Sequence, residues 1–222
     1  LTGIHLEIYS DTVRASACDA FRMAVTEIKC NCGGKMSVTV PKQSFFYLAN
    51  AVEDKDLLEF GLNANTLVFI KSDMLFSTRI ISEPFMNIDR LLNMPDKMLV
   101  AKIKANDMKT MAETVSMITN VSEDTAPVLL KFKNNNLQLS IESTEAESML
   151  NVPIESVNMI SGEFYYNAKY FSDMLKVIRG DVDVYMTKRG VLYASNPVSE
   201  YMLTNSKKRS VKRKSKKTKK AA

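Results

Sequence analysis

The order of hydrophobic and polar positions repeats along the chain at a spacing of 126 residues. Residues 41–52 align without gaps on residues 167–178. In both segments the apolar side chains fall at i, i+3, i+4 and i+7, which is the spacing of one buried helix face. The pattern therefore predicts two amphipathic helices in equivalent places of two related modules. The matched positions are Phe45, Leu48, Ala49 and Val52 in the first segment and Phe171, Met174, Leu175 and Ile178 in the second.

Alternating patterns on both sides of each helix predict antiparallel strands. After the helices, we expect strands at 57–62 and 66–70 in the first copy and at 182–187 and 191–194 in the second. Before the helices, apolar residues alternate around short polar turns, which is typical of β-hairpins. These alternating residues are Leu6, Ile8, Val13, Ala15 and Ala17 in the first hairpin and Leu130, Phe132, Leu137, Leu139 and Ile141 in the second.

The second copy has additional elements ahead of its hairpin. They are a predicted strand at 98–104 and a predicted helix at 106–119, with Asn106 or Asp107 as the N-cap. The first copy has no such segment, so we expect the chain to begin inside a domain. Pro84 and Pro95 bracket a segment of weak pattern, which we interpret as a linker.

The fold class predicted from these elements is α+β, with two domains of mainly antiparallel sheet covered on one side by helices. We expect an incomplete domain at 1–88 that lacks its first strand and helix. A second domain is expected at 89–204, and a basic, disordered tail at 205–222.

Charge is distributed unevenly along the 222 residues. The chain has 30 Lys and Arg against 25 Asp and Glu, but ten of the cations lie between Lys207 and Lys220, where no acid occurs. The body therefore carries about −5 and the tail about +10. The chain has no apolar stretch long enough for a membrane span and no signal-like start, and its three cysteines fit a reducing compartment. We expect a cytoplasmic protein.

No catalytic constellation emerges from the sequence. Cys30 and Cys32 are separated by one residue, whereas structural zinc sites space their paired cysteines more widely, so a loop with incidental thiols is the preferred interpretation. The single histidine, His5, has no nucleophile motif beside it. A thiol or zinc enzyme that uses Cys18, Cys30 and Cys32 is a weaker alternative. We expect no cofactor and no metal.

Basic residues gather on helix faces although the body is acidic. Lys169, Lys176 and Arg179 fall within one stripe opposite the apolar face of their helix. Lys109 stands likewise opposite the apolar face of its helix, and Lys42 heads the helix of the first copy. A solvated amphipathic face is the simpler interpretation, and a surface that faces a polyanion is the alternative.

Several segments together resemble the bacterial β sliding clamp, the processivity subunit of the replicative DNA polymerase III. Residues 1–8 and 13–25 are similar to the family's hairpin and its Ala-Thr-Asp-Gly-His-Arg-Leu-Ala-Val motif. The similarity extends over residues 1–204. Further matching segments are residues 40–42, 76–85, 164–170 and 201–204.

The resemblance implies a non-catalytic clamp with three domains in each protomer, two protomers in a ring, sheets outside and paired helices inside. This chain would supply the second and third domains. Double-stranded DNA would be contacted without sequence preference, and we expect this chain alone not to close a two-protomer ring. The DNA-facing residues would be Lys42, Lys109, Lys169, Lys176 and Arg179.

The resemblance also implies partners: the polymerase III catalytic subunit, the clamp loader and other proteins that carry a short clamp-binding peptide. Cys18, Ala20 and Phe21 stand where the family has Thr, Gly and His. Met117 and Ile118 would lie at the dimer interface of the full-length form, although the helical spacing places Ile118 on the core side. The peptide-binding pocket would include Leu1, Cys18, Ala20, Phe21, Arg22, Met23, Met86, Arg90, Leu91, Met202, Leu203 and Thr204.

A second function is compatible with the same sequence. A stand-alone DNA-associated or clamp-decoy module would be held to DNA by its basic tail rather than by encirclement. Both functions place the protein on the nucleoid.

Overall fold

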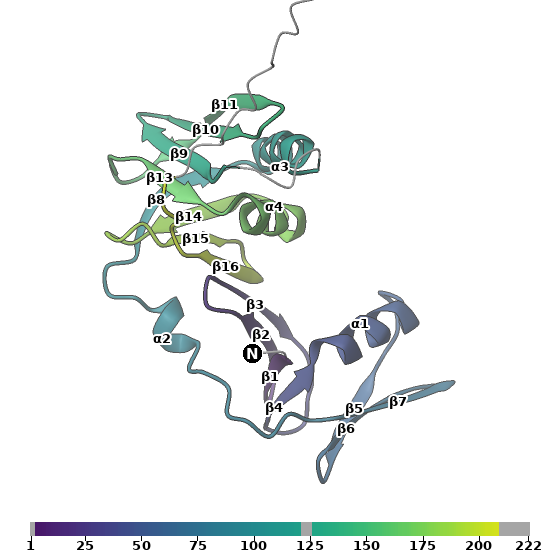
Figure 1. Ribbon diagram of the computed structural model, residues 1–222. Helices are drawn as coiled ribbons and strands as arrows, with labels where there is room; N and C mark the ends of the chain where they lie inside the picture. The colour runs from purple at the N-terminus through teal and green to yellow at the C-terminus, as the bar shows by residue number, and fades with distance from the viewer. Residues whose placement is uncertain (1–2, 121–125, 209–222) are drawn as a thin grey trace, which may run out of the picture. The chain divides into compact units, whose positions relative to one another are not determined.

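The computed structural model describes residues 3–120 and 126–208 and divides the chain into two compact units, Leu1–Asn93 and Met94–Ala222. Each unit combines antiparallel sheets with helices (Figure 1). The predicted α+β class is therefore confirmed. No helix within the described residues is long and apolar enough to cross a membrane.

The first unit contains two antiparallel sheets and helix α1. Strands β3, β2, β1 and β4 are neighbours in that order, and β5, β6 and β7 form the second sheet. Its core includes Leu6, Val40, Leu48 and Leu67. The elements are β1 (Gly3–Tyr9), β2 (Thr12–Cys18), β3 (Arg22–Lys29), β4 (Met36–Pro41), α1 (Lys42–Ala51), β5 (Glu59–Asn63), β6 (Thr66–Lys71), β7 (Met74–Arg79) and α2 (Asp89–Leu92).

The second unit repeats this plan and adds to it. Strands β11, β10, β9 and β13 form one sheet, and β12, β8, β14, β15 and β16 form the other. Helices α3 and α4 lie side by side on the same side of the sheets (Figure 1). The elements are β8 (Met98–Ile103), α3 (Ala105–Thr119), β9 (Val128–Lys133), β10 (Asn136–Glu142), β11 (Glu147–Pro153), β12 (Glu155–Ser156), β13 (Phe164–Tyr166), α4 (Ala168–Val177), β14 (Val182–Met186), β15 (Leu192–Ser195) and β16 (Ser199–Leu203).

The order of elements confirms the predicted repeat. The series β1, β2, β3, β4, α1, β5, β6, β7 in the first unit recurs as β9, β10, β11, β13, α4, β14, β15, β16 in the second. Helices α1 and α4 occupy the two predicted segments. Strand β8 and helix α3 have no counterpart among residues 3–93, and the predicted linker contains the short helix α2.

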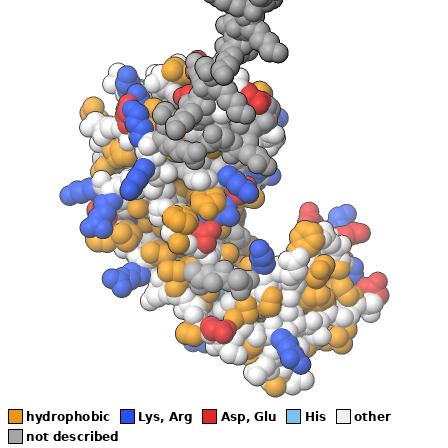
Figure 2. Space-filling model, in the orientation of Figure 1, with side chains coloured by type: hydrophobic (Ala, Val, Ile, Leu, Met, Phe, Trp, Pro, Cys, Tyr) orange, Lys and Arg blue, Asp and Glu red, His pale blue; other side chains and the backbone are white. Residues whose placement is uncertain are grey.

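The two equivalent helices differ in what covers them. On α4, Ser172 is 2% exposed and Leu175 is buried beside α3. On α1, the residue aligned with Ser172 is Phe46, which is 61% exposed, and the residue aligned with Leu175 is Ala49, which is also exposed. Hydrophobic side chains consequently remain at the surface of the first unit (Figure 2).

The predicted N-cap of α3 is wrong. The helix begins at Ala105, one residue earlier than expected, and neither Asn106 nor Asp107 caps it. The Ala105 amide instead donates a hydrogen bond of 3.0 Å to the carboxylate of Asp181. Asp181 follows α4 in the chain. A side chain from a distant segment therefore satisfies one of the free amides at this helix start.

Candidate functional site

Helix α4 presents two lysines to solvent opposite its buried face. Phe171 and Met174 are buried in the core of the second unit, while Lys169 and Lys176 are exposed. Within the described part of the chain, neither lysine has a carboxylate within 4.0 Å. These two ammonium groups are therefore available to an external anion.

The other three predicted DNA-facing residues differ in the groups that their charged side chains contact. Lys109 is exposed on α3 and lies 4.0 Å from Glu113, one turn along the helix. The guanidinium of Arg179 donates to the backbone carbonyls of Lys176 and Ile178, so it also caps the end of α4. Lys42 is exposed at the start of α1.

The turn between β2 and β3 carries the first group of predicted peptide-binding residues. Asp19 holds it in shape, because its carboxylate accepts from the amides of Phe21 and Arg22 at 2.8 and 2.9 Å and from the Arg22 guanidinium at 3.0 Å. Partial burial would raise the pKa of Asp19, but these hydrogen bonds outweigh burial and lower it. Phe21 is 54% exposed as a result of this turn, and Ala20 is exposed beside it.

Sequence reasoning missed Asp19, although an Asp followed by a turn is a recognisable signal. Met23 begins the buried part of β3 and is only 2% exposed. Its partner across the strand pair is Cys18, whose thiol donates to the sulfur of Met86 at 3.0 Å. Burial, with a smaller contribution from Asp19, raises the pKa of this thiol. The structure thus brings Cys18, Met23 and Met86 to one region of the first unit.

The remaining predicted pocket residues lie in α2 and in β16. Arg90 is exposed on α2, and Leu91 is half-buried next to it. In the second unit, Leu203 is buried in the core. Met202 is 7% exposed on the opposite face of β16, and Thr204 follows at its end. Leu1 lies outside the described residues.

The two residues expected at a dimer interface have opposite surroundings. Met117 is 65% exposed on α3, whereas Ile118 is 7% exposed and belongs to the core. Ile118 therefore stabilises the second unit, and Met117 is the residue of the pair that a partner could contact.

The three cysteines differ in how they are bonded. Cys30 and Cys32 are bonded to each other as a disulfide, which corrects the interpretation as incidental thiols, and Cys18 is free. Among residues 3–120 and 126–208, no three His, Cys, Asp or Glu side chains are grouped as metal ligands. His5 is held by the hydroxyls of Thr39 and Ser37.

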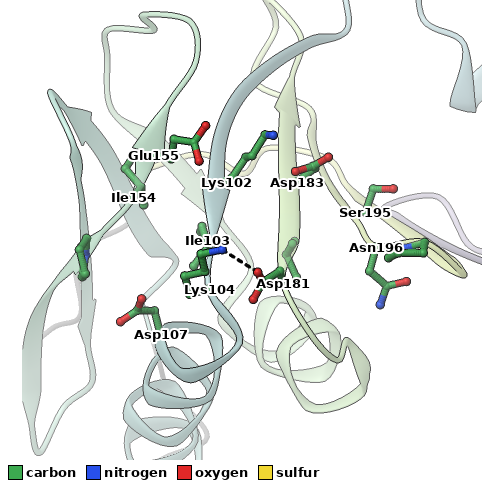
Figure 3. Close-up of a pocket in the computed structure, with 13 residues that line it drawn as sticks. Lys102, Ile103, Lys104, Asp107, Ile154, Glu155, Asp181, Asp183, Ser195 and Asn196 are labelled. Atoms are coloured by element: carbon green, nitrogen blue, oxygen red, sulfur yellow. Dashed lines mark hydrogen bonds and ion pairs between the residues drawn. The ribbon is translucent and has the colours of Figure 1, made fainter.

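A separate cavity of about 560 Å³ lies within the second unit, between the start of α3 and the ends of β8 and β14 (Figure 3). Lys104 and Asp181 form an ion pair at 2.8 Å on its wall. None of the predicted site residues lines this cavity. Its charged side chains are of both signs: Lys102, Lys104, Asp107, Glu155, Asp181 and Asp183.

Comparisons with known proteins connect this geometry to one family. Residues 1–87 match the family described as "DNA polymerase III beta subunit, central domain". The beta sliding clamp of Synechocystis sp. is 23% identical over 197 residues, which cover 80% of this chain and 49% of that protein. The chain is similar to the beta sliding clamps in both comparisons.

Solved structures support the same fold for both units. A putative DNA polymerase III beta subunit from Eubacterium rectale superposes with a TM-score of 0.82 at 20% identity, covering 92% of this chain and 57% of that one. The beta subunit from Pseudomonas aeruginosa gives a TM-score of 0.79 at 20% identity over 93% of this chain and 58% of that one. The chain therefore spans about half the length of the proteins it matches.

The first residues of the basic tail are anchored to strand β13 and its neighbouring residues. The Ser206 amide donates to the Tyr165 carbonyl on β13 at 2.6 Å. Lys208 lies 3.7 Å from the Glu163 carboxylate and 5.8 Å from the centre of the Tyr165 ring. The expectation of disorder from residue 205 onward is therefore corrected for residues 205–208, and residues 209–222 lie outside the described part.

Glu163 gives this anchor a predicted pH dependence. Hydrogen bonds from Lys131 and Tyr165 lower the pKa of Glu163 to about 2, from a usual value of 4.5. Because the folded pKa is the lower one, the stabilisation is complete above pH 4.5 and is lost as the pH falls through about 2. We expect an NMR titration of the Glu163 carboxyl carbon to show a midpoint near 2. A midpoint near 4.5 would contradict the described contacts of Glu163 with Lys131 and Tyr165, and Glu163→Gln identifies the resonance.

Proposed function

We propose that this chain supplies two clamp domains of a non-catalytic processivity factor for DNA replication in the cytoplasm. The repeated order of elements, present in both units, is the observation that carries the proposal. The first unit corresponds to a middle clamp domain without a counterpart of β8 and α3, and the second to a C-terminal clamp domain. Encirclement of DNA requires additional domains, because the chain covers 49% of the Synechocystis clamp.

In this proposal the exposed faces of α3 and α4 contact the phosphate backbone of duplex DNA. Within the described residues, no carboxylate pairs with Lys169 or Lys176. A DNA phosphate can therefore serve as the anionic partner of each ammonium group. Lysine is suited to this task because its ammonium group binds phosphate as a point charge without reading base edges. Contacts of this kind are exchangeable and permit movement along the duplex.

The second part of the proposal is that the chain binds short peptides carried by the polymerase, the clamp loader and related partners. In the first unit, the exposed Phe21 and Met86 offer apolar surface and Arg90 offers a cation. Apolar walls with a few polar groups are the usual chemistry of a peptide-binding site.

Two binding measurements test the proposal. Two short duplexes of equal length and unrelated sequence should bind with equal affinity, and that affinity should fall steeply with salt. A fluorescein-labelled synthetic peptide that carries the clamp-binding segment of a bacterial replicative polymerase should bind the chain, and Arg90→Ala should weaken this binding. Sequence-selective DNA binding, or no peptide binding, would contradict the proposal.

The tail-held module remains the competing function, and its ten cations are the observation in its favour. It predicts that all DNA binding disappears when the tail is removed, because the body carries about −5. It also predicts equal retention on circular and linear plasmids. A clamp-type protein keeps a residual, helix-dependent affinity in the absence of the tail.

A further inference from the structure

The segment that follows β7 is attached to the first unit at several points. Residues 80–92, here called the connector segment, run back across the β1–β4 sheet after β7 ends. Its contact with β4 is a backbone hydrogen bond of 2.7 Å from the Ile81 amide to the Thr39 carbonyl. Two of the proposed peptide-binding residues, Met86 and Arg90, belong to this segment.

An aromatic stack forms the second attachment. The rings of His5 on β1 and Phe85 in the connector segment lie 4.6 Å apart between centroids, with an angle of 8° between their planes. The His5 ring is fixed in turn, because Nδ1 lies 3.0 Å from the Thr39 hydroxyl and Nε2 lies 3.3 Å from the Ser37 hydroxyl. Both hydroxyls come from β4, so the ring is held across two strands before Phe85 stacks on it.

An ion-pair network forms the third attachment. Arg14 on β2 donates to Glu7 from Nε at 2.7 Å and from a terminal nitrogen at 2.6 Å, and its other terminal nitrogen donates to Asp89 at 2.8 Å. Its side chain is 13% exposed. Burial alone would lower the pKa of Arg14, but the hydrogen bonds to Asp89 and Glu7 outweigh burial and raise it.

These attachments lie on one face of the sheet and flank Met86. His5 pairs with Ser16 and Glu7 pairs with Arg14, and the two pairs point to the same side because they are two residues apart. Phe85 precedes Met86 directly, and Asp89 precedes Arg90 directly. Each of the two proposed peptide-contacting side chains therefore follows directly on an anchored residue.

We propose that the His5–Phe85 stack is a positioning device that presents Met86 and Arg90 to a bound peptide. This inference relies on the peptide binding proposed above and adds two residues that do not themselves contact the peptide. Without the stack, Phe85 loses its fixed orientation, and residues 86–90 must be ordered again when the peptide binds. The cost of that ordering reduces affinity.

The test compares four variants of the full chain with the labelled polymerase peptide as probe. His5→Ala and Phe85→Ala should each weaken peptide binding about three- to tenfold, the range expected for loss of one aromatic pair. The double variant should be no weaker than either single one, because both remove the same stack. His5→Phe keeps a ring at this position and should retain most of the affinity.

Hydrogen exchange and a control separate positioning from general damage. Amide exchange over residues 86–92 should accelerate in both alanine variants and stay close to the wild-type rate in His5→Phe. Phe46→Ala removes an exposed aromatic residue of the same unit and should leave peptide binding unchanged. Unchanged binding in Phe85→Ala, or additive losses in the double variant, would overturn this inference alone. Failure of the wild-type chain to bind the peptide would overturn the proposed function and this inference with it.

Discussion

Replacing Phe171 by alanine is expected to destabilise the second unit by about 3–5 kcal/mol, the usual cost of removing a buried phenyl ring. Phe171 is 1% exposed on α4, and its ring lies 6.2 Å from that of the fully buried Tyr166. The substitution leaves a cavity between α4 and the sheet that the surrounding side chains fill only in part. Urea unfolding followed by tyrosine fluorescence measures the effect, because most tyrosines lie in this unit.

Val177 provides the matched control for this substitution. It lies on the same helix but is 53% exposed, so Val177→Ala should change the free energy of unfolding by no more than about 0.5 kcal/mol. Equal effects of the two substitutions would show that α4 does not pack as described.

Ending the chain at Ser206 is expected to have the largest effect on DNA binding. The removed segment contains ten cations and no acid. Each phosphate neutralised contributes about 0.9 to the slope of log affinity against log salt, so removal of the tail should reduce that slope by up to about 9. Titration of one duplex at several salt concentrations measures the slope for both chains. An unchanged slope would show that the tail does not contact DNA.

The amphipathic pattern was sufficient to predict the repeat and the two helices at its centre. Helices α1 and α4 lie within the predicted segments because their apolar positions have a period that only a helix with one buried face satisfies. The hairpins were equally predictable, because β1 with β2 and β9 with β10 are joined by short polar turns. Local signals of this kind need no knowledge of distant residues.

The contacts that sequence reasoning missed join residues far apart in the chain. The Asp181 carboxylate accepts a hydrogen bond from the amide at the start of α3, which is 76 residues away in the sequence. Phe85 stacks on His5, which lies near the other end of the first unit's sequence. Neither pairing has a local signature, since it depends on the register between strands and on where a loop returns. Leu203 illustrates the same limit, because side chains alternate between the two faces of β16 and the register of that strand decides which face is turned to the core.

The candidate site was predictable in part. Exposure of Lys169 and Lys176 followed from the helical spacing, but the backbone contacts of Arg179 did not. For the proposed peptide-binding residues, the resemblance gave positions, and the structure added Asp19 as the residue that shapes the turn carrying Phe21. Sequence identifies which side chains are present, whereas their orientation depends on hydrogen bonds that form only in the folded chain.

The central claim, that the α3 and α4 faces hold duplex DNA, is tested most directly in the chain that ends at Ser206. A variant with Lys109, Lys169 and Lys176 replaced by alanine is compared with a second variant, called the turn variant. In the turn variant, the exposed cations Lys133, Lys188 and Arg189, which lie in or beside turns, are replaced by alanine. The helix variant should lose the remaining salt-dependent affinity, with a decrease in slope of about 2–3, while the turn variant binds as the parent does. Equal losses in both variants, or no loss in the helix variant, would contradict the claim.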